Sequence, residues 1–136
     1  MSRDGSLRVE FRKHLRDAQW TSIETGLTEG GVPDSEYMFK GGIGGWIEFK
    51  KTATNAVGLR PLQIAWLSRR ARLGGRCFVA VLHKKDTLFL FHGKHVAALK
   101  SDGICGTEAL GVWTGGIAKW DWDMIRKILM QSPCSA

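Results

Sequence analysis

Cysteine and long hydrophobic runs are both scarce in this sequence. Its 136 residues include three cysteines, Cys77, Cys105 and Cys134, and no two of them have C-x-x-C spacing. We therefore expect free thiols in a reducing compartment rather than a disulfide-bonded secreted domain. No apolar stretch approaches the roughly 18 residues that a transmembrane helix needs. The N-terminus also has no apolar segment typical of a signal peptide. The sequence predicts a cytoplasmic protein with no membrane partner.

Acidic side chains are outnumbered by basic ones. The chain has 13 Asp and Glu against 20 Lys and Arg, which gives a formal charge of +7. Such a charge favours a polyanionic partner, whether nucleic acid, acidic protein or anionic lipid, and nucleic acid is the first candidate. The length suits one domain over residues 1–136 that buries its own core, and no internal repeat or long linker divides it.

Hydrophobic periodicity predicts an α/β domain. Leu7, Phe11, Leu15 and Ala18 recur at helical spacing, and Pro61 sits at a plausible first turn of a second helix that stops at the glycine pair 74–75. Alternating or continuous apolar residues predict strands between and after these helices. The expected order is helix 6–20, strands 35–40 and 45–51 joined by a turn over 41–45, helix 61–73, strands 76–83 and 87–93, a short helix 94–100, an irregular glycine-rich stretch and helix 120–130.

The strand "GWIEFKK" over residues 45–51 has one unusual face. Ile47 and Phe49 point to one side, where they favour a core. Trp46, Glu48 and Lys50 point to the other side. The charged pair is either a solvated surface ion pair of little energetic value or a reactive site on a rigid strand.

A second carboxylate belongs to the same region. If strands 35–40 and 45–51 pair antiparallel, Asp34 comes near Glu48 and Lys50 at the end away from the turn. Two adjacent carboxylates repel each other unless a cation lies between them, and oxygen ligands favour Mg²⁺ or Mn²⁺. Together with the basic charge, this pattern indicates metal-dependent phosphodiester hydrolysis.

The spacing of these residues resembles a known nuclease superfamily. The segment 31–34, "GVPD", is followed after thirteen residues by Glu48-Phe49-Lys50, as in the PD-(D/E)XK nucleases. The longer similarity, over about residues 20–82, includes "PLQIAW" and resembles the VRR-NUC branch, the virus-type replication and repair nucleases. The resemblance implies a restriction-endonuclease-like fold, a mixed β-sheet flanked by helices with a core order α-β-β-β-α-β. That core would span about residues 7–92, with 93–136 as a C-terminal elaboration.

The resemblance also assigns roles to individual residues. It implies that Lys50 positions the attacking water and that Gln63 helps to hold this lysine or the scissile phosphate. For the third carboxylate, Glu29 remains a rival of Glu24. The implied ligands of Mg²⁺ or Mn²⁺ are Glu24, Asp34, Glu48 and the backbone carbonyl of Phe49.

The function that follows is a metal-dependent endodeoxyribonuclease of a phage or phage-like genome, acting in the host-cell cytoplasm. By resemblance, it would act as a homodimer on branched DNA such as Holliday junctions. Two alternatives stay open, namely a DNA-binding module with a vestigial nuclease site and a basic protein-interaction domain. The residues expected to contact the DNA backbone are basic and cluster in two places, Arg69, Arg70 and Arg72 in one and Lys84 and Lys85 in the other.

The remaining aromatic, aliphatic and histidine residues suggest no further chemistry. Zinc is not expected, because His83, His92 and His95 lack zinc-ligand spacing and more plausibly cap strand ends or touch phosphate. Two groups of apolar residues are expected to be buried. Leu62, Trp66 and Leu73 are predicted to be core, and Trp113, Trp120 and Trp122 to be core or to cover a dimer surface.

Overall fold

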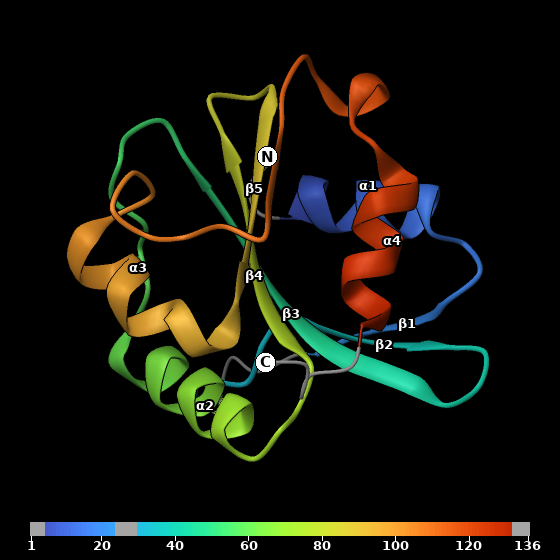
Figure 1. Cartoon of the computed structure of the whole chain (residues 1–136), viewed down its shortest axis with the longest axis horizontal. Coiled ribbons are helices and arrows are strands. Elements are labelled where there is room, and N and C mark those ends of the chain that lie inside the picture. Colours follow the sequence, from blue (N-terminus) through green and yellow to red (C-terminus); the bar gives the residue numbers. More distant parts are fainter. Residues whose placement is uncertain (1–4, 24–29, 132–136) are drawn as a thin grey trace.

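The fold is one mixed sheet with helices on both faces (Figure 1). The computed structural model describes residues 5–23 and 30–131. The strands, which lie in the sheet in chain order, are β1 Gln19–Ser22, β2 Ser35–Phe39, β3 Ile43–Thr52, β4 Cys77–His83, β5 Thr87–His92 and β6 Gly111–Trp113. The helices are α1 Gly5–His14, α2 Pro61–Arg72, α3 Val96–Asp102 and α4 Trp122–Met130, with short 3₁₀ turns η1 Gly93–His95 and η2 Ile117–Lys119.

Every neighbouring pair of strands is antiparallel except β3 and β4, which are parallel and are connected through α2. The order α1-β1-β2-β3-α2-β4 is the α-β-β-β-α-β core that the resemblance implies. The predicted α/β fold class, a mixed β-sheet flanked by helices with this core order, is therefore confirmed. The C-terminal residues add β6 to the sheet edge and α4 to one of its faces.

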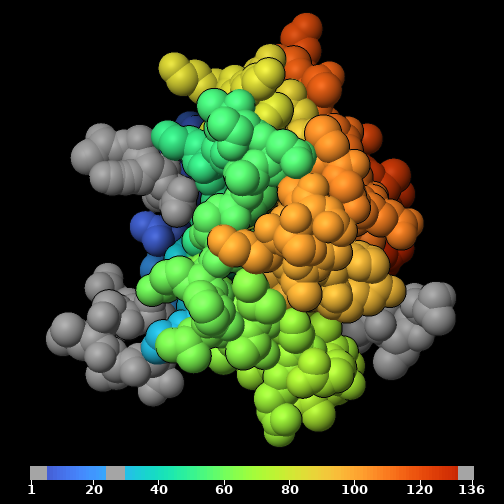
Figure 2. Space-filling view, turned by 90° about the vertical axis from the view of Figure 1, so that its left-hand side faces the viewer, coloured from blue at the N-terminus to red at the C-terminus, as the bar shows by residue number. Residues whose placement is uncertain are grey.

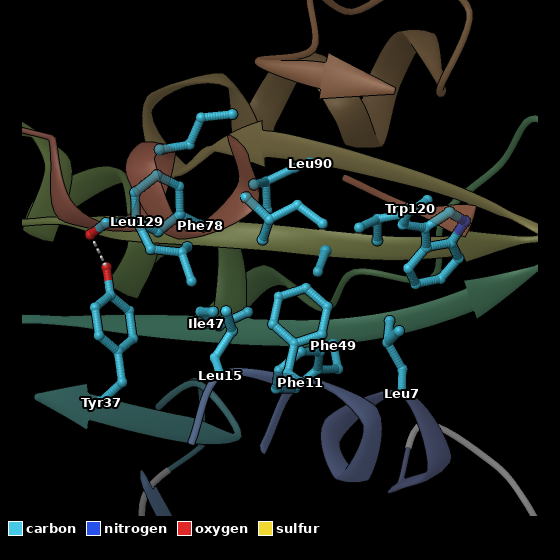
Figure 3. Packing of buried hydrophobic residues seen from close by; sticks show 14 of the residues in the cluster. Leu7, Phe11, Leu15, Tyr37, Ile47, Phe49, Phe78, Leu90, Trp120 and Leu129 are labelled. Carbon is cyan, nitrogen blue, oxygen red and sulfur yellow. Dashed lines mark hydrogen bonds between the residues drawn. The ribbon is translucent and has the colours of Figure 1, made fainter. Parts of the chain in front are cut away.

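The apolar residues form two cores, one on each face of the sheet. Figure 1 shows that α1 and α4 cover one face and α2 and α3 the other. On one face, α1 and α4 pack against the inward residues of β3, so that Ile47 and Phe49 are completely buried as the alternation predicts (Figure 3). On the other face, α2 and α3 cover β4, whose residues are buried on both sides. A strand covered on both faces reads as a continuous apolar run, which is why β4 was recognisable.

Two strands were missed by the sequence prediction. The first helix was expected to continue to Trp20, but α1 ends at His14 and Trp20 lies in β1. β1 has only four residues, three of them exposed, so it carries no alternating apolar pattern. β6 is a three-residue edge strand within the glycine-rich stretch. The β2–β3 turn is also shorter than predicted, since β3 already begins at Ile43.

The buried side of α2 is not the predicted one. Leu62 is 61% exposed and Leu73 is 69% exposed, so the prediction that they belong to the core was wrong. The fully covered residues of α2 are Gln63 and Leu67, while Trp66 is only partly buried. The side of α2 that faces the sheet begins with the polar residue Gln63, because it lies over the charged residues of β3. A polar residue at this position made the buried side of the helix hard to recognise from the sequence.

The late tryptophans pack within the chain. Trp120 is 4% exposed, and its indole nitrogen donates a hydrogen bond to the carbonyl of Asp86 at 3.0 Å. Trp122 stacks on His14 of α1, with ring centroids 4.4 Å apart. Trp122 therefore joins α4 to α1, and Trp120 attaches the chain just before α4 to the β4–β5 turn. The expectation that Trp120 belongs to the core is confirmed. Trp113 is partly buried against the same core.

Tyr37 provides a test of how α4 is fixed to the sheet (Figure 3). Its hydroxyl donates a hydrogen bond of 2.6 Å to the carbonyl of Leu129, in the last turn of α4, where carbonyls lack helical partners. Burial raises the pKa of this hydroxyl, which therefore stays a donor. Tyr37→Phe keeps the ring but leaves a buried carbonyl unpaired, so we expect a loss of about 1–3 kcal/mol in unfolding free energy. Urea denaturation measures it, and an unchanged midpoint would contradict the assignment.

Candidate active site

The charged face of β3 is covered by α2. The side chain of Glu48 is 3% exposed and that of Lys50 15% exposed, with 3.4 Å between the lysine nitrogen and Glu48 Oε2. The interpretation of this pair as a solvated surface ion pair is therefore wrong. A buried ion pair is stable only where further groups satisfy both charges.

Asp34 lies beside this pair, as the sequence predicts. The register that pairs Ser35 with Ile47 places Asp34 opposite Glu48 on the same face of the sheet. Its Oδ2 atom accepts a hydrogen bond of 3.0 Å from the backbone nitrogen of Phe49. Its carbonyl accepts another, of 2.8 Å, from the nitrogen of Ile23 just beyond β1. Asp34 is thus attached to both neighbouring strands.

The backbone carbonyl of Phe49 faces the same space. The amide and carbonyl of one strand residue point toward the same neighbouring strand. Because the amide of Phe49 points to Asp34, its carbonyl also points past the end of β2 rather than into the β3–β4 ladder. The amide of Trp46, three residues earlier and of the opposite parity, donates to the carbonyl of Arg76 on the β4 side.

Gly31 sets the path of the chain toward Asp34. Its φ angle is +100°, and a Cβ atom added there would lie 2.4 Å from the carbonyl oxygen of Leu62 in the first turn of α2. Only glycine fits this close approach, and the φ value also favours it. The loop before Asp34 therefore rests directly on α2, a role for the glycine of "GVPD" that the sequence pattern alone does not reveal.

The side-chain amide of Gln63 connects Glu48 and Lys50. Its Oε1 atom accepts hydrogen bonds from the backbone nitrogen of Arg60 at 3.0 Å and from Lys50 Nζ at 3.2 Å. Its Nε2 atom donates to Glu48 Oε2 at 2.9 Å. Because both partners of Oε1 are donors, the orientation of the amide is determined by its surroundings. The structure thus brings together four of the predicted site residues, Asp34, Glu48, Lys50 and Gln63.

The electrostatics of Glu48 suit a cation. Its pKa is raised from the ordinary 4.5 to about 7, first by burial and second by the negative charge of Asp34, while the Lys50 ammonium acts in the opposite direction. Its Oε1 atom is buried and finds no hydrogen-bond partner within residues 5–23 and 30–131. An unpaired buried carboxylate oxygen is costly, and a bound cation would remove that cost.

The donor set fits Mg²⁺ or Mn²⁺. Asp34, Glu48 and the Phe49 carbonyl offer oxygen atoms alone, the ligands that these hard ions prefer. Among the described residues, no group of three or more His, Cys, Asp or Glu side chains is placed to hold a metal ion. The expected third carboxylate, Glu24, and its rival Glu29 lie outside the described residues.

The predicted DNA-contacting residues lie on two sides of this site. Arg69, Arg70 and Arg72 are in the last turn of α2, beside the start of β3. Lys84 and Lys85 form the β4–β5 turn beyond the end of β3, and both have positive φ angles, 54° and 76°. Figure 2 shows this face, with α2 at the bottom and the β4–β5 turn at the top. The structure does not bring the two groups together, and the site lies between them.

The histidines and cysteines serve local packing. His92 Nδ1 accepts a hydrogen bond from the Lys94 nitrogen and so caps η1. The His83 ring packs edge-on against Phe89. Cys77 and Cys105 are free thiols, one buried and one exposed.

In the described part of the chain, no helix is both long and apolar enough to span a bilayer.

Comparisons with known proteins find a distant likeness among solved structures. The sequence matches no protein-family model and no curated protein. Among solved structures, the chain is similar to Hjc, a Holliday junction resolvase of the archaeal hyperthermophile Archaeoglobus fulgidus, with a TM-score of 0.46 and 19% sequence identity. The similarity covers 65% of this chain and 72% of that one.

Proposed function

We propose that this chain is a divalent-metal-dependent endodeoxyribonuclease that hydrolyses DNA phosphodiester bonds. The observation that carries this proposal is the buried Glu48, which has one oxygen held by Gln63 and Lys50 and the other unpaired, opposite Asp34. The formal charge of +7 suits a DNA substrate.

Each residue has a distinct task in this reaction. Asp34, Glu48 and the Phe49 carbonyl would hold Mg²⁺ or Mn²⁺, which when bound polarises a phosphate oxygen and lowers the pKa of a coordinated water. Lys50 places its ammonium beside the carboxylates, where it orients the nucleophile and neutralises developing negative charge. Gln63 fixes this ammonium through Oε1 and the metal-binding carboxylate through Nε2, so that the two cannot move independently.

The finer assignments rest on the sequence resemblance. They are membership of the VRR-NUC branch, a phage-like origin and selectivity for branched DNA such as Holliday junctions. The proposed cytoplasmic location rests instead on the number and spacing of the cysteines. A homodimer accords with such a substrate, because two strands related by a near-twofold axis need two matched active sites. Lys84, Lys85 and the arginines of α2 are proposed to contact the DNA backbone on the two sides of the cut.

Cleavage of a panel of duplex, single-stranded, flap and four-way-junction DNAs tests the proposal. We expect cleavage with Mg²⁺ or Mn²⁺, none with EDTA, and a preference for branched substrates. Asp34→Ala should reduce cleavage at least about 100-fold while DNA binding persists. The control is Arg16→Gln, at an exposed residue to which the proposed reaction gives no task, and it should match the wild type.

The other outcomes identify the alternatives. Salt-sensitive DNA binding without cleavage in any divalent metal would contradict the nuclease proposal and favour a DNA-binding module. Absence of DNA binding even at low ionic strength would leave a protein-interaction domain.

A further inference from the structure

A groove adjoins the candidate active site and is lined in part by Trp46 and Arg76, to which the proposed reaction gives no task. It lies between the β2–β3 hairpin and the C-terminal turn of α2 and has a volume of about 320 Å³. We call it the hairpin groove, and its main lining residues are Glu36, Met38, Gly44, Trp46, Arg70 and Arg76.

The hairpin groove continues directly from the site. Trp46 and Glu48 are on the same face of β3, two residues apart, which in a strand corresponds to about 7 Å. Glu36 is paired with Trp46 just as Asp34 lies opposite Glu48. A strand of DNA whose phosphate sits at Glu48 therefore has its neighbouring nucleotide at the groove.

One wall of the groove is formed by Arg70 and Arg76, whose positive charges are available to bind an anion. The Arg70 guanidinium lies 4.4 Å from the ring centre of Trp66 and 5.6 Å from that of Trp46. Stacking of this kind leaves the N–H groups in the guanidinium plane free to bind an anion. Arg76 uses its Nε atom to bind the carbonyl of Gln131. Within the described residues, neither guanidinium has a carboxylate within 4.0 Å.

The position of Arg70 is fixed by the end of α2. Gly75 donates a hydrogen bond to the carbonyl of Arg70, and Gly74, with a φ angle of +86°, donates to that of Ala71. This pair of bonds is a Schellman motif. A Cβ atom at Gly75 would lie 2.5 Å from Arg70 Cδ, so the arginine stem folds back over this glycine. The helix end thereby holds the guanidinium against the tryptophans.

The opposite wall of the groove and the volume of the groove limit which ligand can bind. Glu36 on β2 repels a phosphate but can accept hydrogen bonds from the amino groups of a base. Trp46, only partly buried, lies between the acidic and basic walls and offers an aromatic surface for stacking. A nucleotide has this same polarity, with an anionic phosphate and a neutral base. A double helix, whose major groove alone is about 12 Å wide, does not enter a cavity of this volume.

We propose that the hairpin groove binds an unpaired nucleotide next to the scissile phosphate, with its base on Trp46 and its phosphate facing Arg70 and Arg76. The substrate class is then DNA with an unpaired nucleotide beside the cut, rather than continuous duplex. The link to cleavage rests on the nuclease function proposed above, whereas binding of the nucleotide does not.

Binding is tested with the full chain in EDTA and a single-stranded tetradeoxynucleotide that contains 2-aminopurine. Stacking on Trp46 should quench the fluorescence of this base. Trp46→Leu and Arg70→Gln should each weaken binding about tenfold or more, as expected for one lost base–aromatic stack or phosphate contact. Met38 is 39% exposed, so its substitution should cost little packing. Met38→Glu adds a negative charge to the groove and should weaken binding of the anionic nucleotide, whereas Met38→Lys adds a positive charge and should strengthen it. Arg16→Gln is the matched control. Equal binding by all these variants would overturn the proposal.

Cleavage separates this proposal from the nuclease proposal. With Mn²⁺, the wild type should cut a substrate with unpaired nucleotides beside the cut faster than the fully paired duplex of the same sequence, and Met38→Glu should reduce that preference. Cleavage whose preference is unchanged in Met38→Glu would overturn the groove as a substrate site while leaving the nuclease. Quenching that depends on Trp46 in a protein that cuts no DNA would support the groove and contradict the nuclease.

Discussion

Glu48→Gln should abolish DNA cleavage and at the same time make the metal-free protein more stable above neutral pH. Cleavage falls because the amide cannot replace a charged metal ligand, and we expect a loss of at least about 1000-fold. Stability rises because the wild-type carboxylate is 3% exposed and must ionise against burial and against the charge of Asp34.

The pH range of this stability effect follows from the direction of the pKa shift. The pKa of Glu48 is about 7 in the folded protein and 4.5 ordinarily, so the folded state binds the proton more tightly. Below pH 4.5 the group is protonated in both states and costs nothing. Between pH 4.5 and about 7 stability declines, and above that the full cost of about 3 kcal/mol is present. Glu48→Gln should therefore match the wild type near pH 4 and exceed it by up to about 3 kcal/mol at pH 8.

Urea denaturation in EDTA at pH 4 to 8.5 measures this difference. Glu108→Gln, the same chemical change at an exposed residue, serves as the control. Saturating Mn²⁺ should raise the melting temperature of the wild type but not that of Glu48→Gln, because a ligand stabilises the state that binds it. A wild type that is as stable as Glu48→Gln at pH 8 would show that the carboxylate is not held in a desolvated, charge-repelling position.

The sequence predicted the parts of the fold whose pattern is local. β2, α2, β4, β5 and α4 follow from apolar periodicity, together with proline and glycine at the ends of α2. β1 and β6 could not be recognised in this way, because short edge strands are stabilised by backbone pairing with β2 and β5 rather than by their own side chains. The family order nevertheless contains the strand corresponding to β1, which residue patterning alone assigned to a helix.

The candidate site shows the same division. Alternation in β3 and antiparallel pairing were enough to predict that Asp34, Glu48 and Lys50 meet. That the charged face is buried was not predictable, since it depends on the rotation of α2, and the apolar residues Leu62 and Leu73 suggested a different rotation. Trp46 had no role until the structure placed it beside Arg70 at the hairpin groove.

Lys50→Met should reduce DNA cleavage about 100- to 1000-fold without weakening DNA binding. The magnitude is that of a single positioned donor or cation in an active site. The ammonium is held by Gln63 Oε1 at 3.2 Å and Glu48 Oε2 at 3.4 Å, so methionine removes the charge while filling a similar volume. Single-turnover cleavage with saturating Mn²⁺ measures the effect on the reaction, and the salt dependence of binding measures any lost phosphate contact.

Loss of the Lys50 ammonium also changes the pKa of Glu48, and this indirect effect can be separated from the direct effect on the reaction. Lys50 lowers the pKa of Glu48, so this pKa should rise further in Lys50→Met and metal binding should require a higher pH. Activity that returns fully at pH 9 with excess Mn²⁺ would mean that Lys50 acts through Glu48 alone. A loss that persists there supports a direct part in the reaction. The matched control is Lys51→Met, one residue later on the opposite face of β3 and exposed, which should cleave like the wild type.

Gln63→Leu removes the hydrogen bond to Lys50 but keeps the charge of the lysine. It should therefore reduce DNA cleavage less than Lys50→Met does, by about 10- to 100-fold.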